Sequence, residues 1–140
     1  MRLVLDTNTV LSGLLWHGPP GRLIEAASNG NIEIVSSVAL LTELRDVLAR
    51  DKFARRLSQR GFTVARLFTD YVALVTIVAP ALIARTIVQD PPDDAVLAAA
   101  LGASAELIVS GDAHLLDLKS FQGIEIVTAT AAVTRILPAS

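Results

Sequence analysis

The stretch Leu3-Val4-Leu5-Asp6-Thr7-Asn8 opens the chain with three apolar residues that run directly into a polar turn. A short, uninterrupted apolar run is typical of a parallel strand that is buried on both faces. Such strands belong to α/β folds, in which ligands bind beyond the carboxyl ends of the strands. Because Asp6 directly follows the run, we expect it to lie at that edge of the sheet.

The rest of the chain repeats this pattern of short apolar runs separated by amphipathic segments. Four further runs predict strands at 32–35, 76–78, 107–109 and 124–127. The segments between them predict helices at 9–15, 22–28, 36–48, 53–58, 63–72, 95–101, 113–118 and 129–136. Strands that alternate with helices favour a mostly parallel sheet with helices on both faces. We expect one α/β domain over residues 1–140.

The composition is that of a folded protein without thiol chemistry. Apolar residues make up 52 % of the chain and charged residues 19 %, which argues against disorder. The absence of cysteine excludes a disulfide framework, a zinc–thiolate site and a thiol nucleophile. Asp6 interrupts the N-terminal segment before any signal-peptide core, and no apolar run approaches the length of a membrane span. We therefore expect a soluble, cytoplasmic protein with no membrane partner.

Four acidic residues lie at the end of a predicted strand or in a helix that follows one: Asp6, Glu43, Asp94 and Asp112. In an α/β sheet such positions converge at one edge. Two unit charges about 4 Å apart interact by roughly 4 kcal/mol at an effective dielectric constant of about 20. Carboxylates gathered at this edge therefore repel one another unless a cation binds between them. Oxygen-rich acidic clusters suit Mg²⁺ or Mn²⁺. The pattern favours a metal-dependent phosphodiesterase site, with Asn8 and Ser110 as supporting groups.

Each acid also has a simpler structural interpretation. Asp6 and Asp112 precede helical segments and are typical N-caps. Glu43 lies at the boundary of the apolar stripe of its helix, where a surface glutamate is common. Asp90, Asp93 and Asp94 all stand at one helix start. We assign Asp93 to capping and Asp94 to the site, and the two can exchange these roles.

Basic residues concentrate between positions 45 and 66, although the net charge of −2 provides no overall basic field. The residues are Arg45, Arg50, Lys52, Arg55, Arg56, Arg60 and Arg66. One interpretation is a solvated helical face. The other is a rim that contacts phosphates beside an acidic cleft.

The histidines and aromatic residues carry weaker signals. His17 and His114 show no metal-ligand spacing, and Trp16 is expected to be a packing residue. The segment between positions 53 and 72 contains several aromatic residues: Phe53, Phe62, Phe68 and Tyr71. Core filling is one explanation for them, and a dimer interface is the other.

Taken in order, the stretch 3–8, the helix 36–48, the segment 90–100 and the segment 107–116 resemble a PIN domain over nearly the whole chain. The resemblance implies an α/β/α sandwich with a five-stranded parallel sheet in the order 3-2-1-4-5. It also implies Mg²⁺- or Mn²⁺-dependent cleavage of RNA. The acids that it assigns to the metal and to catalysis are Asp6, Glu43, Asp94 and Asp112. Supporting roles fall to Asn8, Ser110 and Asp93. The residues expected to grip the RNA backbone are Arg45, Arg50, Lys52, Arg55 and Arg56.

The Ser110-Gly111-Asp112 version of the last motif resembles the subgroup of toxin components from type II toxin–antitoxin modules. That resemblance implies an antitoxin partner that covers the cleft, and a homodimer. The chain departs from the family pattern at His114, which stands where relatives often carry another acid. The number of metal ions therefore stays open at this point.

Three rival interpretations remain. A phosphatase of the haloacid dehalogenase type needs a second aspartate two residues after the first, where this chain has Asn8. That phosphatase and a receiver-type signalling domain both use a late lysine, for which Lys119 is badly placed. The third rival is a catalytically silent PIN-like module that binds RNA or a protein. Metal-dependent turnover that is lost in Asp6→Asn would exclude it.

Overall fold

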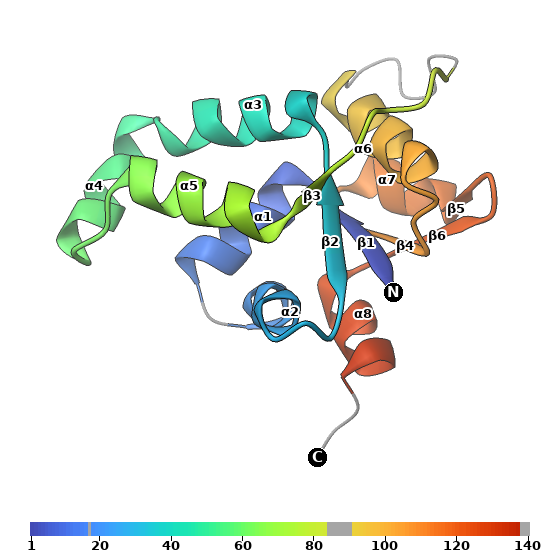
Figure 1. Ribbon diagram of the computed structural model, residues 1–140, viewed down its shortest axis with the longest axis horizontal. Helices are drawn as coiled ribbons and strands as arrows, with labels where there is room; N and C mark the ends of the chain where they lie inside the picture. The colour runs from blue at the N-terminus through green and yellow to red at the C-terminus, as the bar shows by residue number, and fades with distance from the viewer. Residues whose placement is uncertain (17, 84–90, 138–140) are drawn as a thin grey trace.

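The sheet is built around β1, with parallel neighbours on both sides. The computed structural model describes residues 1–16, 18–83 and 91–137, without the side chains of 51, 53, 91 and 92. Within these ranges the strands form a six-stranded sheet in the order β3-β2-β1-β4-β6-β5 (Figure 1). Every neighbouring pair is parallel except β5 and β6. The strands are β1 (Arg2–Leu5), β2 (Glu33–Ser36), β3 (Thr76–Ile77), β4 (Leu107–Val109), β5 (Ser120–Phe121) and β6 (Ile124–Val127).

Helices cover both faces of this sheet. Buried residues of α6 and α7 form the core on one face, and those of α1, α2 and α8 form the core on the other (Figure 1). Within the described residues, no helix is long and apolar enough to cross a membrane. The helices are α1 (Thr7–Leu15), α2 (Pro19–Ser28), α3 (Val38–Leu48), α4 (Asp51–Gln59), α5 (Val64–Leu74), α6 (Pro91–Gly102), α7 (Ala113–Leu118) and α8 (Ala129–Ile136).

The apolar residues of β1 contribute to the hydrophobic cores on both faces of the sheet. Leu3 and Leu5 pack into the core with α1, α2 and α8, whereas Val4 packs into the core with α6 and α7. Successive side chains of a strand point to opposite faces, so a strand covered on both sides needs an apolar residue at every position. None of these three side chains is more than 4 % exposed. This burial fixes β1 in the middle of the sheet.

The predicted α/β/α class is confirmed, and the strand count differs by one short strand. The predicted strand 124–127 is β6, and it occupies the expected fifth place in the order. The addition is β5, which pairs with β6 antiparallel through a two-residue turn at Gln122 and Gly123. Their φ angles are 47° and 84°, which is the pattern of a type I′ hairpin turn. A two-residue strand has no periodicity that a sequence pattern can detect.

Two helices, α2 and α6, begin three or four residues earlier than the sequence predicts. α2 starts at Pro19 and α6 starts at Pro91, where the predictions start at Arg22 and Ala95. Proline interrupts a helix interior but fits its first turn, because the first N–H groups of a helix have no partner within the helix. The Pro-Pro pairs therefore open these helices instead of preceding them. For α6, the shift moves Asp93 into the helix proper.

Candidate active site

The carboxyl ends of β1 and β4 meet in the centre of the sheet. The parallel register pairs Leu5 with Val109. The backbone N–H of Asp6 continues the ladder by donating to the carbonyl oxygen of Val109 at 3.1 Å. Asp6 and Ser110, which directly follow the two strands, therefore lie side by side although 104 positions separate them in the chain.

The carboxylate of Asp6 is buried and is held from two directions. Its side chain caps α1, because Oδ1 accepts from the backbone N–H of Thr9 at 2.8 Å. Oδ2 accepts from the hydroxyl of Ser110, and Asp6 is only 5 % exposed. The N-cap interpretation is therefore correct, but it does not exclude a second role. Each carboxylate oxygen has more than one lone pair, so a capped aspartate can still bind a cation.

Ser110 connects Asp6 to Asp112. While its hydroxyl donates to Asp6, Ser110 Oγ accepts from the backbone N–H of Asp112 at 2.9 Å. Asp112 in turn caps α7, since its Oδ1 accepts from the N–H of His114 at 2.8 Å and from that of Leu115 at 3.3 Å. Ser110 is 1 % exposed, so this connection is shielded from water. Loss of the Ser110 hydroxyl would therefore remove one contact to each of the two acidic residues.

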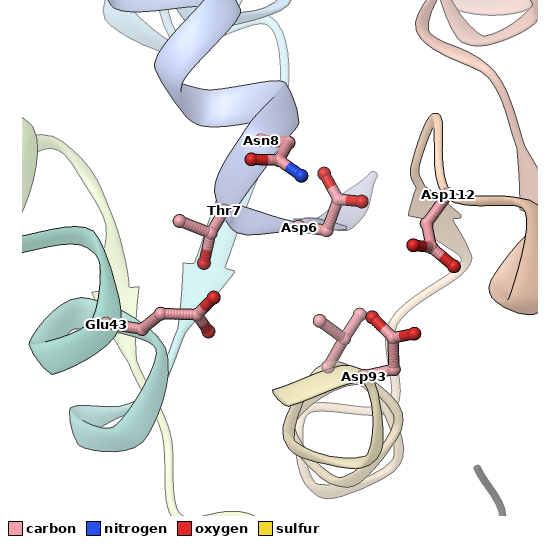
Figure 2. Close-up of a pocket in the computed structure, with 7 residues that line it drawn as sticks. Asp6, Thr7, Asn8, Glu43, Asp93 and Asp112 are labelled. Carbon is pink, nitrogen blue, oxygen red and sulfur yellow. The ribbon is translucent and has the colours of Figure 1, made fainter. Parts of the chain in front are cut away.

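The acids line one small cavity together with groups from other elements (Figure 2). Its volume is about 60 Å³, which leaves room for a cation with water molecules. Figure 2 shows Glu43 reaching in from α3, opposite Asp93 on α6 and Asp112 after β4. The lining residues are Asp6, Thr7, Asn8, Glu43, Asp93, Val96 and Asp112. Thr7 and Val96 had no role in the sequence-based hypothesis.

The cavity lining differs from the sequence-based assignment at one position. Asp93, which is 6 % exposed, lines the cavity, whereas the half-buried Asp94 is not part of the lining. Successive residues of a helix point about 100° apart, so the choice between them depends on the rotational phase of α6. The predicted helix 95–101 is apolar at every position, so its sequence has no polar face from which this phase can be derived. Asp90, at the same predicted entry to the helix, lies outside the described residues.

His114 joins the acids, although its sequence spacing gave no sign of a metal ligand. Asp93, Asp112 and His114 each offer one possible ligand atom, and these atoms all lie within 4.8 Å of one another. Nδ1 of His114 is 3.9 Å from Oδ1 of Asp112. The signal that the sequence did carry is the resemblance, which placed His114 where relatives often have another acid. Two carboxylates and an imidazole are a donor set that fits a divalent ion.

The sequence of the chain also matches a known family. A family model described as PIN domain matches residues 2–114, which is most of the chain. The chain belongs to the PIN domain family. No curated protein was found to match it. The PIN domain is a nuclease-type fold whose members generally depend on divalent metals, so the match supports a hydrolase of the nuclease kind.

The residues of this PIN domain that were predicted to contact RNA lie on α3, on α4 and between them: Arg45, Arg50, Lys52, Arg55 and Arg56. All of them except Arg56 are exposed, and among the described residues none of them lines the acidic cavity. Arg45 forms an exposed ion pair with Asp46 at 3.8 Å, an arrangement that contributes little to stability. Arg56 is half-buried, and its guanidinium carbon lies 3.5 Å from the ring centroid of Trp16.

The aromatic residues divide between core and surface. Tyr71 is 4 % exposed and belongs to the core with α1 and α3, so core filling is the explanation that holds for it. Phe68 packs against the same core, which favours core filling there too. Phe62 is 51 % exposed and Trp16 is 48 % exposed, so the expectation that Trp16 is a packing residue is only half correct. The side chain of Phe53 lies outside the described residues.

Proposed function

We propose that this PIN domain is a Mg²⁺- or Mn²⁺-dependent ribonuclease that hydrolyses RNA phosphodiesters. The observation that carries the proposal is the convergence of four carboxylates on one small cavity: Asp6, Glu43, Asp93 and Asp112. Carboxylates repel a phosphodiester, so such a cavity suits this substrate only together with a cation. In this proposal Asp93 takes the role for which the sequence analysis chose Asp94.

The donor set indicates which residues would hold the cation. Asp93, Asp112 and His114 would bind it, because their ligand atoms are already close together. Asp6 and Glu43 line the same cavity and would bind directly or through water, since Mg²⁺ usually keeps several of its waters. Imidazole binds first-row transition ions better than it binds Mg²⁺, so His114 favours Mn²⁺.

The residues around the cavity divide the work of hydrolysis. A bound divalent cation would acidify the attacking water and offset the negative charge that develops on the phosphate. Asp6 keeps one orientation because the N–H of Thr9 and the hydroxyl of Ser110 hold its two oxygens. Glu43 reaches in opposite Asp93, where a carboxylate oxygen can accept the proton that the water loses. The exposed amide of Asn8 can donate a hydrogen bond to a phosphate oxygen.

The substrate would be held by cations outside the cavity. Arg50, Lys52 and Arg55 are exposed on or next to α4, which follows the helix that carries Glu43. Lysine and arginine contacts to phosphates supply affinity that does not depend on sequence and that falls with salt. These residues would therefore grip the RNA backbone, and Arg45 would join them at the end of α3.

Cleavage of a panel of labelled RNAs tests the proposal. The purified protein is assayed with Mn²⁺, with Mg²⁺ and with EDTA, beside Asp6→Asn and Asp93→Asn. Asp117→Asn is the matched control, because it removes an exposed carboxylate of α7 that does not line the cavity. We expect metal-dependent cleavage by the wild type and Asp117→Asn and none by the other two variants. Equal trace cleavage by all four proteins would indicate a contaminant, and no cleavage would favour the silent binding module.

The same proposal includes a role as the toxin of a toxin–antitoxin module, with an antitoxin that covers the cleft and a homodimeric toxin in the cytoplasm. Its support is the resemblance of Ser110-Gly111-Asp112 to the toxin subgroup. Induced expression should arrest growth for the wild type and not for Asp6→Asn. Sedimentation equilibrium tests the dimer, and a monomer at every concentration would remove that part of the proposal.

A further inference from the structure

A second cavity lies where α1 ends, remote from the acids. Its volume is about 520 Å³, in the range of pockets that hold small ligands. Trp16 and Phe62, each about half exposed, contribute two aromatic rings to its lining. Arg22 and Arg60 contribute two cations, against one acid, Glu25. Aromatic rings that stay exposed beside arginines are a combination that indicates a binding surface.

The walls of this cavity are held in place before any ligand arrives. The guanidinium of Arg56 stacks on the ring of Trp16 at 3.5 Å. Arg60 Nη1 donates to the carbonyl oxygen of Leu15 at 2.9 Å, which ties the end of α4 to the end of α1. Side chains that are already ordered lose little conformational entropy on binding. Besides this contact with Arg56, Trp16 lines the cavity together with Arg22 and Arg60.

We propose that this cavity binds a base of single-stranded RNA, stacked on Trp16 and Phe62, with the neighbouring phosphates on Arg22 and Arg60. Aromatic rings stack on any base, and a positively charged groove follows the phosphates of a single strand. The inference rests on the proposed function for its substrate and adds a site that holds the strand away from the cleaved bond. Net positive lining argues for a polyanion over an apolar ligand.

The geometry relates this site to the acidic cavity. α1 begins beside Asp6 and ends at the aromatic cavity, and its nine residues span about 14 Å. That length corresponds to roughly four nucleotides at a stacked spacing of ~3.4 Å. Figure 1 shows α4 at the end of the molecule that is far from α6 and α7. Arg60, directly after α4, lines the aromatic cavity, whereas Asp93 on α6 lines the acidic one. The aromatic site would thus determine which phosphodiester of the RNA strand lies at the acidic cavity. It would take no part in the cleavage itself.

Fluorescence gives a direct test, because Trp16 is the single tryptophan of the chain. Short oligoadenylate and oligouridylate are titrated into the Asp6→Asn protein in EDTA, where neither a metal nor turnover is required. We expect saturable quenching of Trp16 emission that weakens with salt. Phe62→Ala should weaken the affinity about tenfold, and Arg60→Gln should weaken it several-fold. Arg66→Gln is the control, because Arg66 pairs with Asp70 on α5 and does not line the cavity.

Any one of the following four results would overturn the proposal. Absence of quenching shows that no base stacks on Trp16. Equal quenching by an abasic oligonucleotide of the same length reduces the cavity to a general anion site. Equal quenching by oligoglutamate assigns it to an acidic protein partner. An unchanged affinity in Phe62→Ala, with a native far-UV circular dichroism spectrum, removes the aromatic cavity from the binding site. A failed cleavage assay leaves these results intact, and a failed titration leaves the cleavage assay intact, so the two proposals fail separately.

Discussion

Asp93→Asn and Asp94→Asn form a matched pair that tests which acid faces the cavity. Both substitutions remove one negative charge, keep the side-chain shape and stand next to each other on α6. The ligand atoms of Asp93 and Asp112 lie within 4.8 Å of each other, and at that distance two unit charges repel by about 3.5 kcal/mol at an effective dielectric constant of about 20. The side chain of Asp112 is 30 % exposed, so solvent screens part of this repulsion. We expect Asp93→Asn to raise the free energy of unfolding by about 1–3 kcal/mol without metal.

Urea unfolding in EDTA measures the repulsion between the acids, and the same measurement in excess Mn²⁺ measures the stabilisation by the metal. In EDTA, Asp93→Asn should have a higher free energy of unfolding than the wild type. The free energy of unfolding of Asp94→Asn should be closer to that of the wild type. In Mn²⁺ the order should change, because a ligand that binds the folded state stabilises it by mass action. The wild type and Asp94→Asn should gain stability, and Asp93→Asn should gain less because it has lost a ligand.

The opposite pattern would refute this reasoning. If Asp94→Asn is stabilised in EDTA and loses its response to Mn²⁺ while Asp93→Asn behaves as the wild type, Asp94 faces the metal. The sequence-based assignment would then be right and the structural one wrong. Equal responses of both variants would remove this end of α6 from the metal site.

Three further predictions concern stability. Ser110→Ala removes a buried hydroxyl that donates to a carboxylate, which should cost about 1.5–3 kcal/mol in urea unfolding; an unchanged midpoint would contradict the connection described for it. Burial raises the pKa of Tyr71 above its ordinary value of 10.0, so the unfolded state loses this proton first and stability falls by about 1.4 kcal/mol per pH unit above that value. Tyr71→Phe should flatten this fall, and parallel stability curves of the two proteins above pH 10.0 would argue against it. Gly102→Ala should destabilise by about 1–3 kcal/mol, because the added Cβ would lie 2.3 Å from the carbonyl oxygen of Ala79, which is backbone and cannot easily retreat. Gly111→Ala is its control, since a Cβ there meets nothing within 4 Å, and equal melting temperatures for both variants would show that α6 relaxes freely.

Much of the architecture follows from local sequence alone. The run 3–5 can satisfy its burial only as a strand covered on both faces, and the helix 129–136 has the bounds that its pattern predicts. The positions of Asp6 and Ser110 at strand ends follow from the same pattern, because a strand ends where its apolar run ends. The parallel order then brings these two residues together, as the α/β class requires.

Other features could not be derived from local patterns. A two-residue strand such as β5 exists only because β6 offers it a partner. The burial of Tyr71 and the exposure of Trp16 depend on how α1, α3 and α5 pack, not on the hydropathy of either residue. Both residue types can serve a core or a surface, so composition alone leaves the choice open.

The acidic residues show which features the sequence determined and which features depended on the tertiary structure. The sequence by itself determined that acidic residues follow β1 and β4 and that an acid pair opens α6, because apolar periodicity marks the ends of elements. Only the tertiary structure decided that Asp93 and not Asp94 lines the cavity, and that His114 lies beside it. The physical reason is that a one-residue change in helix phase turns a side chain by about 100°, and contacts across the sheet fix that phase.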